Sequence, residues 1–253
     1  MTSAGAPSNW LADLREAAAF LTTVVPGRAG PSPRSMALFP IVGTALGLTT
    51  GGVWRAARHV LPAGVAASVV TAFDAAVTGA IHLDGLADVA DGMFAHVPAK
   101  SRLDIMSEPQ VGTFGTVALS TSLIARSAAF AAVEPSALLL ASLWASSRAL
   151  MVVGSRLLPY ARDQGLATPF LDEGRRADAA LYVGVASIAA ASLVTLRTHG
   201  RRGMLGVLVG TAAGAGLLRG AQARLGGFTG DVLGAAGVIS ETVALLVIAG
   251  GSR

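Results

Sequence analysis

The chain has 253 residues, of which 53% are hydrophobic and only 13% are charged, and its mean hydropathy is +0.61. A soluble domain has about 25% charged residues, so this chain lacks the polar surface that a water-facing globule needs. It contains no cysteine, which excludes disulfides and thiolate metal sites. Its arginines stand in short loops between apolar runs, which is typical of membrane proteins, so we expect no nucleic-acid partner despite the net charge of +4.

The first apolar segment, residues 9–25, predicts a helix that ends before Pro26. It is only moderately apolar, so we expect it to lie at the membrane interface. No basic stretch precedes an apolar one at the start, so the segment does not have the pattern of a cleaved signal peptide. Residues 26–35 predict a loop rich in Pro, Gly, Ser and Arg.

Seven longer apolar spans follow and approach the roughly 20 residues that a membrane-crossing helix needs. The sequence therefore predicts an all-α, polytopic integral membrane bundle of about seven transmembrane helices plus the interfacial helix, built as a single domain over residues 1–253. Small-residue pairs in two spans, Gly43 with Gly47 and Gly210 with Gly214, predict close helix packing. The predicted spans are 37–55, 63–82, 112–133, 136–153, 179–196, 203–218 and 231–249.

The distribution of arginines favours an N-terminus in the cytoplasm, because most of them then fall in cytoplasmic segments. The basic segment 197–202 falls on the outer side and opposes this orientation. Under this topology the segments 82–111, 154–178 and 219–231 share the cytoplasmic side. We therefore expect a multi-pass protein of the bacterial cytoplasmic membrane with its functional site facing the cytoplasm.

The stretch HLDGLADVADGMFA, residues 82–95, carries the strongest chemical signal. At about 100° per residue on a helix, Asp84, Asp88 and Asp91 share one stripe about 60° wide. Carboxylates this close repel unless a cation neutralises them, and hard oxygen ligands shared with phosphates suit Mg²⁺. The sequence predicts a catalytic magnesium and diphosphate site here, against the plainer interpretation of a polar helix end facing water.

Three residues of the same stretch extend this interpretation. Gly85 and Gly92 lie beside the carboxylate stripe and would leave room for a bulky anion to approach the backbone. His82 is a candidate catalytic residue that orients a carboxylate or acts as a base, although a histidine at a membrane boundary is commonly just interfacial.

Residues 100–115, KSRLDIMSEPQVGTFG, add a second group of candidates. Lys100 and Arg102 are candidates for binding phosphate oxygens. Asp104 and Glu108 stand four residues apart, can face one way on a helix, and are candidate metal ligands. The alternative is a solvated charged loop.

Gly112 and Gly115 follow Pro109 and open the next span. A glycine-bearing helix N-terminus is a plausible anion cradle, so both glycines are predicted substrate-binding residues.

Two further segments complete the predicted site. Arg156 and Arg162, in segment 154–178, are candidates for binding a nucleotide, although a positive-inside loop would look similar. In segment 224–241, Thr229 or Asp231 would cap the last helix, Thr229 is also a substrate-binding candidate, and Asp231 is a candidate metal ligand.

Ionisable residues also occur inside the predicted spans. Glu241 is a functional candidate because intramembrane charges are costly. We expect Asp74, Arg126 and Arg148 to pair among themselves.

Taken together, HLDGLADVADG, RLDIM followed five residues later by GTFG, and GGFTGDVLGA resemble the adenosylcobinamide-GDP ribazoletransferase (cobalamin synthase) family. AAAFLTTVVP and FPIVG also match its pattern, so the resemblance covers nearly the whole chain. It implies a polytopic membrane enzyme that joins adenosylcobinamide-GDP to α-ribazole or its 5′-phosphate, releases GMP and requires Mg²⁺.

One departure from the family's pattern stands after Met106. The family usually has a basic residue, an aspartate and a second basic residue there. This chain has Ser107, Glu108 and, after Pro109, Gln110. The carboxylate is kept and two positive charges are lost, so any phosphate contact must come from elsewhere in the chain.

The sequence leaves two other functions open. A CDP-alcohol phosphotransferase also has a DGxxA stretch with later aspartates, but it has Arg where Asp88 stands here and a longer spacing. A cation-coupled transporter would use Asp74, Asp84, Asp88 and Glu241 as an ion path, but the chain lacks related halves. A lipid bilayer is the expected surrounding, and a homo-oligomer is compatible with the sequence.

Overall fold

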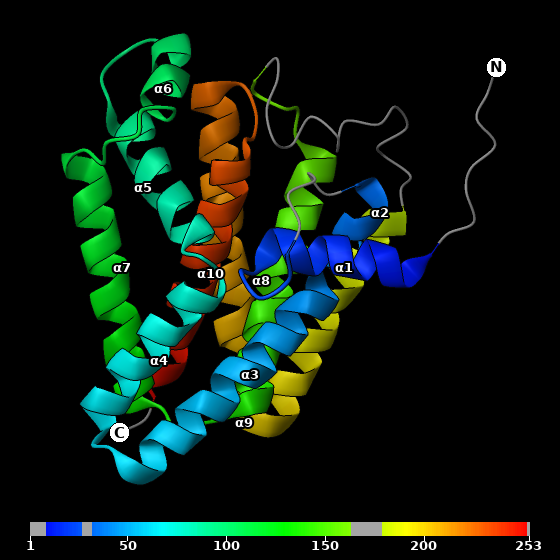
Figure 1. The fold of residues 1–253 in the computed structure, drawn as a ribbon, viewed down its shortest axis with the longest axis vertical. Coiled ribbons are helices and arrows are strands. Elements are labelled where there is room, and N and C mark those ends of the chain that lie inside the picture. The colour runs from blue at the N-terminus through cyan, green and yellow to red at the C-terminus, as the bar shows by residue number, and fades with distance from the viewer. Residues whose placement is uncertain (1–8, 27–31, 163–178, 252–253) are drawn as a thin grey trace.

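A computed structural model describes residues 9–26, 32–162 and 179–251, which form ten helices and one isolated β-bridge. Helices α7 to α10 run along the length of the molecule, and α1 lies across them (Figure 1). The predicted all-helical class is confirmed. The helices are α1 (Trp10–Leu21), α2 (Pro33–Met36), α3 (Phe39–Val60), α4 (Ala63–Val77), α5 (Ile81–Phe94), α6 (Ala99–Ile105), α7 (Thr113–Ala132), α8 (Ala137–Leu157), α9 (Ala179–Leu225) and α10 (Gly230–Ala249).

Several helices have the length and composition of membrane spans. Within the described ranges these are α7, α8, α9 and α10, and a fifth span results if the bent pair α4 and α5 crosses as one unit. A multi-pass membrane protein is therefore the class that the fold defines. The predicted number of seven spans is not reached by this criterion and stays a prediction.

Helix α9 is two arms joined at Gly200, whose φ of 65° and ψ of −160° are not helical. A side chain at Gly203 would collide with the carbonyl of Thr195, so the chain folds back on itself at this point. Figure 1 shows one arm descending and the other ascending. The two arms correspond to the apolar segments predicted at 179–196 and 203–218.

The predicted span 63–82 has the wrong C-terminal boundary, because α4 ends at Val77 and α5 leaves it at 89°. Gly79 and Ala80 make this bend with φ values of 60° and 55°, a left-handed conformation that is strained for alanine. Thr23, just beyond α1, donates its backbone N–H to the Val77 carbonyl at 2.9 Å and its hydroxyl to the Ala76 carbonyl at 3.1 Å. These bonds satisfy carbonyls that the broken helix leaves free, as a low-dielectric interior requires.

The bend decides where the aspartate stretch lies. Helix α5 packs against α7 and α10 and runs from the middle of the bundle to one end (Figure 1). The end of α8, the end of α9 and the start of α10 lie at that same end, so the described parts of the three segments predicted on one side do gather there.

Glycines allow the closest helix contacts. A side chain at Gly43 or Gly47 of α3 would collide with the backbone of α8, and one at Gly210 or Gly214 of α9 would collide with the backbone of α10. Both predicted small-residue pairs are therefore confirmed as packing surfaces. Dispersion contacts between closely approaching backbones stabilise helix pairs where no hydrophobic effect operates.

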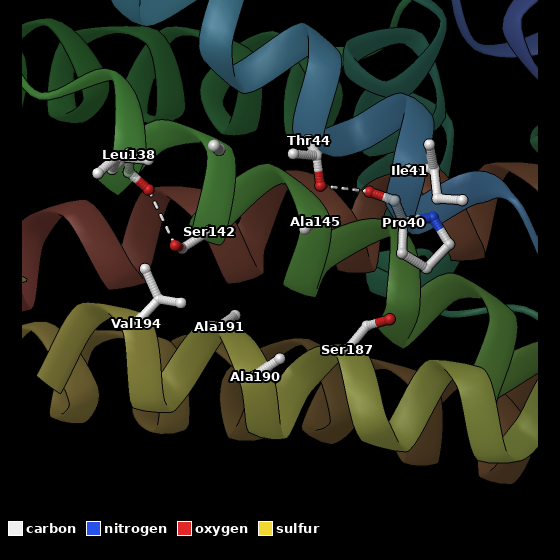
Figure 2. Close-up of a pocket in the computed structure, with 11 residues that line it drawn as sticks. Pro40, Ile41, Thr44, Leu138, Ser142, Ala145, Ser187, Ala190, Ala191 and Val194 are labelled. Carbon is white, nitrogen blue, oxygen red and sulfur yellow. Dashed lines mark hydrogen bonds between the residues drawn. The ribbon is translucent and has the colours of Figure 1, made fainter. Parts of the chain in front are cut away.

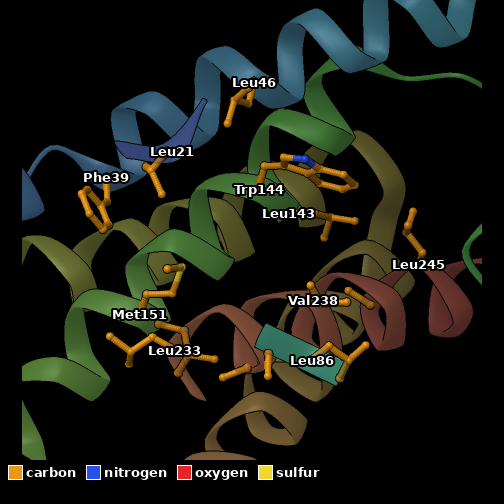
Figure 3. Close-up of a cluster of buried hydrophobic side chains, with 14 of the residues drawn as sticks. Leu21, Phe39, Leu46, Leu86, Leu143, Trp144, Met151, Leu233, Val238 and Leu245 are labelled. Carbon is orange, nitrogen blue, oxygen red and sulfur yellow. The ribbon is translucent and has the colours of Figure 1, made fainter. Parts of the chain in front are cut away.

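The remaining interior is an apolar cluster between α3, α5, α8 and α10 (Figure 3). Trp144 and Leu143 of α8 lie near its centre, and both are at most 1% exposed. Leu86 of α5 and Val238 of α10 complete the contact on the side of the aspartate helix.

Replacing Gly47 by Ala should destabilise the protein, because the added methyl group meets the backbone of α8 and not a movable side chain. We expect a loss of about 1–3 kcal/mol, the usual range for overpacking, measured by thermal unfolding in detergent. Gly52→Ala on the same helix is the matched control, since a methyl group there meets nothing within 4 Å. Equal melting temperatures for the two variants would contradict this account of the α3–α8 contact.

Candidate functional site

Helices α5 and α10 meet closely at the centre of the candidate site. A side chain at Gly85 would lie 2.7 Å from the backbone oxygen of Asp231, the second residue of α10. Gly85 therefore does not leave room for an anion, as the sequence suggested, but lets α10 approach the aspartate helix. Gly92 likewise leaves no room for an anion, because Met106 and the backbone of Arg102 pack against it.

This contact adds a fourth carboxylate to the predicted stripe. The negative charges of Asp84 and Asp231, and more weakly that of Asp91, act on Asp88, whereas the positive charge of Arg162 acts in the opposite sense. Arg162 Nη2 lies 3.4 Å from Asp231 Oδ2, and both side chains are about a quarter to a third exposed. One partly exposed ion pair does not neutralise this group, so the site favours a further cation.

The described residues contain no group of three or more His, Asp or Glu side chains that already converges on a metal position. A closed, all-protein metal cage is therefore not present in this part of the chain. Mg²⁺ does not need one, because it commonly uses one or two carboxylates together with substrate phosphates and water. Asp84, Asp88 and Asp231 fit that open arrangement.

Asp91 has a different set of partners. Its Oδ2 accepts the backbone N–H of Gly112 at 2.7 Å, and its Oδ1 accepts that of Gly115 at 2.9 Å. The predicted anion cradle at the start of α7 thus already holds an anion, the side chain of Asp91. A carboxylate at a helix N-terminus satisfies free amides and interacts favourably with the helix dipole.

Asp91→Ala should loosen the start of α7, because two backbone amides lose their acceptor. The loss of stability should be about 0.5–2 kcal/mol, as for other helix N-caps, measured by thermal unfolding together with amide exchange at residues 112–115. Asp104→Ala removes an exposed carboxylate from α6 and serves as the control. Unchanged exchange at the start of α7 in the Asp91 variant would contradict the capping role.

The two basic candidates of the segment 100–115 differ: Arg102 binds the end of α5, and Lys100 is exposed. Arg102 Nη1 donates to the carbonyls of Gly92 and Met93 at 3.1 and 2.6 Å, and Arg224 Nη1 donates to the same Met93 carbonyl at 2.9 Å. Two arginines therefore close the C-terminal end of α5. Lys100 is exposed.

The predicted pairing of Asp104 and Glu108 on one helix face is wrong, because α6 ends at Ile105. Glu108 lies in the following turn, where its backbone N–H donates to the Ile105 carbonyl. Both side chains are exposed, and their predicted role as metal ligands stays untested.

The segments after α8 and before α10 are joined by a short bridge between Tyr160 and Phe228. Their rings lie 5.3 Å apart, and Phe228 donates its N–H to the Pro159 carbonyl at 2.9 Å. This bridge holds Arg162 beside α10. Arg156 is buried near the end of α8, and the rest of the predicted nucleotide-binding loop, 163–178, lies outside the described residues.

Thr229 is the N-cap of α10, and its hydroxyl accepts the N–H of Val232 at 3.2 Å. The same hydroxyl donates to Asp231 Oδ2 at 3.2 Å. Thr229 thus fixes both the start of α10 and the carboxylate that it brings to the site.

Deeper in the bundle the predicted pairing of Asp74 with Arg126 is confirmed, whereas Arg148 pairs with Glu241, which the sequence had indicated separately as a functional candidate. Arg126 Nη2 lies 2.8 Å from Asp74 Oδ2, Arg126 Nη1 lies 3.1 Å from Glu241 Oε2, and Arg148 bonds Glu241 Oε1. Trp144 and Ser147 donate to the same two carboxylates at 2.8 and 2.7 Å. Two acids and two arginines form a group without net charge in which both carboxylates accept hydrogen bonds from arginine, so these acids are not free to form an ion path.

His82 connects this buried group to the site above it. The side chain is 8% exposed, and its Nδ1 lies 3.5 Å from Arg148 Nη2. Its Nε2 is buried and has no hydrogen-bond partner among the described residues. His82 therefore lies inside the bundle.

Glu241→Gln should be strongly destabilising, because it leaves two buried arginines with only Asp74 as a counter-charge. Breaking a buried ion pair costs about 3–5 kcal/mol, so we expect a large drop in melting temperature in detergent. Glu134→Gln, an exposed carboxylate between α7 and α8, is the control. Adding Arg148→Met to Glu241→Gln should recover part of the loss, and a purely additive double variant would argue against coupling.

The fold is that of a multi-pass membrane protein, and it carries a carboxylate site at one end. These features are typical of membrane-embedded enzymes, and comparison with known proteins identifies the family. The cobalamin-5-phosphate synthase family model matches residues 13–249, so the chain belongs to that family. It is 35% identical to the adenosylcobinamide-GDP ribazoletransferase of Bradyrhizobium diazoefficiens, over 95% of this chain and 94% of the relative. The enzymes of that name from Syntrophobacter fumaroxidans and Shigella flexneri are 34% and 33% identical over 83% and 85% of this chain, and over 84% and 87% of their own. No solved structure matches the chain.

Sequence reasoning missed the two roles that depend on contacts between distant segments. Nothing in the spacing around Asp91 identifies it as the cap of a helix that starts more than 20 residues later. The contact between His82 and Arg148 could not be predicted from the sequence either, although the position of His82 beside the acidic stretch did indicate a functional residue.

Proposed function

We propose that this chain joins adenosylcobinamide-GDP to α-ribazole or its 5′-phosphate and releases GMP, as a step in assembling the nucleotide loop of cobalamin. Membership of the cobalamin-5-phosphate synthase family supports this activity. The structural observation that carries the proposal is the crowding of Asp84, Asp88 and Asp231 where α5 meets α10, opposed by Arg162.

The reaction is one phosphoryl transfer. A hydroxyl oxygen of the ribazole forms a bond to the phosphorus on the cobinamide side of the diphosphate. The bond from that phosphorus to the bridging oxygen breaks, GMP leaves with the electron pair, and the hydroxyl proton is lost. Such reactions need mainly positioning and stabilisation of spread negative charge.

A magnesium ion fits this site, with Asp84, Asp88 and Asp231 as its proposed protein ligands. When bound, it would offset the negative charge of the diphosphate and of the departing GMP. In this proposal Asp91, whose two oxygens accept amides of α7, holds the site in place and is not a ligand. Asp104 and Glu108 stay secondary candidates for metal binding.

The chain's own groups position the reactants. Thr229 and Arg162 both contact Asp231 Oδ2 and hold that carboxylate toward α5. Arg162 and the exposed Lys100 are the proposed contacts for phosphate oxygens, since Arg102 is engaged at the end of α5. His82 is proposed to contact substrate from inside the bundle.

We propose that the site faces the cytoplasm and that the chain crosses the lipid bilayer seven times. This number is reached if α3 crosses, α4 and α5 cross as one broken span, and the two arms of α9 count separately. Helix α1, with Trp10 and Leu11 exposed, would then lie along the membrane surface. A homo-oligomer is compatible with this arrangement.

Asp84→Asn should reduce GMP release from adenosylcobinamide-GDP by about a hundredfold or more, because it removes a charged metal ligand. Purified protein would be incubated with Mg²⁺ and α-ribazole 5′-phosphate, and GMP would be followed by chromatography. Treating the wild type with EDTA should have the same effect, and added Mg²⁺ should reverse it.

Glu134→Gln, which also removes one carboxylate, should leave GMP release near that of the wild type. Near-normal turnover of Asp84→Asn, with the protein folded in membranes, would remove the metal site from the proposal.

A further inference from the structure

A cavity of about 280 Å³ lies beneath α1 and α2, next to the carboxylate site. Its walls come from six helices and are mostly apolar: Phe20, Met36, Phe39, Met151 and Leu233. The rings of Phe20 and Phe39 are stacked, with centroids 5.7 Å apart and an angle of 16° between their planes. Flat aromatic walls and two adaptable methionines suit a flat, apolar guest.

The polar groups of this cavity are few and gathered on α5 and α10. His82, Asp84 and Asp231 line it together with the apolar residues. The cavity therefore opens onto the two carboxylates that we propose as metal ligands.

His82 supplies one unused hydrogen-bond donor. Arg148 faces its Nδ1 at 3.5 Å, and a guanidinium has only donors, so Nδ1 is the acceptor and the ring proton is on Nε2. That Nε2 is buried without a partner among the described residues. A buried donor left unpaired is costly, and His82 differs from most such groups here in lining a cavity, so its N–H is available to a ligand atom there.

A second cavity has the same volume, about 280 Å³, but differs from the first in the polar groups of its wall (Figure 2). It lies between α3, α8 and α9 and has no charged residue in its wall. The hydroxyls of Thr44 and Ser142 donate to carbonyls of their own helices, both at 2.9 Å. Ser187 does the same at 2.7 Å. This cavity offers a ligand no free polar group, so volume alone does not make a site.

We propose that the cavity beneath α1 holds the aromatic base of the ribazole substrate, with its unsubstituted ring nitrogen accepting the N–H of His82 Nε2. This assignment rests on the proposed function. A dimethylated benzimidazole is flat and apolar and has one free acceptor nitrogen, which matches apolar walls with a single donor. Its ribose then extends toward Asp84 and Asp231, where the hydroxyl meets the diphosphate.

The other parts of the two substrates fit this cavity less well. Guanine carries several donors and acceptors, most of which the apolar walls would leave unpaired. The corrin macrocycle is far larger than a bicyclic base and exceeds the space. The base of the ribazole is the part whose size and polarity agree with the cavity.

The first test fills the cavity. Gly230 lies in its wall, and a Cβ atom there meets nothing within 4 Å, so Gly230→Leu adds bulk without a backbone clash. We expect the dissociation constant of α-ribazole, measured by equilibrium dialysis with protein in nanodiscs, to rise about tenfold or more. The KM for adenosylcobinamide-GDP should change less than about twofold, since its site is outside the cavity.

Two variants control for size. Gly230→Ala adds only a methyl group at the same position and should bind α-ribazole nearly as well as the wild type. Ala190→Leu fills the second cavity of Figure 2 and should change neither constant.

The second test isolates the hydrogen bond and does not depend on the filled variant folding. An analogue of α-ribazole with indole in place of benzimidazole replaces the acceptor nitrogen by C–H. It should bind the wild type about tenfold more weakly than α-ribazole. In His82→Leu the two compounds should bind equally, and His82→Gln, which keeps a donor, should restore part of the preference.

The results of these binding tests distinguish failure of the proposed base subsite from failure of the proposed reaction. Equal α-ribazole binding by Gly230→Leu and wild type, or a preference for benzimidazole that persists in His82→Leu, overturns the subsite even if GMP is released. Binding that follows these variants without any GMP release keeps the subsite and overturns the proposed function.

Discussion

Burial of charge in a low-dielectric interior is the constraint on which this bundle depends. Glu241 of α10 bonds Arg126 of α7 and Arg148 of α8, and Arg126 also bonds Asp74 of α4. Four long helices are thereby held in one register, because each ion would be very costly if its partner moved away. Packing by glycines brings the backbones together, and this charge network disfavours arrangements of α4, α7, α8 and α10 that would separate the paired charges.

The same network explains how the bundle supports a second, incompletely neutralised group of charges. The buried group is neutral and its acceptors are bonded. Asp84, Asp88 and Asp231 lie nearer the end of the bundle. Of the charged groups that act on Asp88, Arg162 is the one with a positive charge. Stability built into the interior allows a site of like charges at its end, and a cation is the kind of ligand that such a site favours. His82 faces Arg148 of the buried group and lines the cavity that Asp84 and Asp231 also line.

The break between α4 and α5 determines where the aspartates lie in the bundle. A continuous helix would have carried the aspartates out beyond the bundle, whereas the bend at Gly79 and Ala80 turns α5 back between α7 and α10. Broken helices are tolerated in membranes where other groups satisfy the freed carbonyls, and Thr23 does so here. Because Thr23 follows α1, the helix that covers the proposed base subsite is also tied to the bend that orients the aspartates.

The sequence by itself determined the class, most of the helices and the family, and it predicted a site at the acidic stretch. Composition, span length and an in-phase set of aspartates depend only on neighbours along the chain, so local patterns were sufficient. It also predicted that Asp74 and Arg126 would pair, since buried charges have few alternatives, but it did not predict that Arg148 would pair with Glu241. The sequence also offered Asp231 as a candidate ligand, but only the tertiary structure shows why it lies near α5: Gly85 lets α10 approach. Only the tertiary structure shows that Asp91 accepts the amides of α7. Helical phase places side chains on a face, but the partner that a face meets is fixed by packing between segments far apart in the chain.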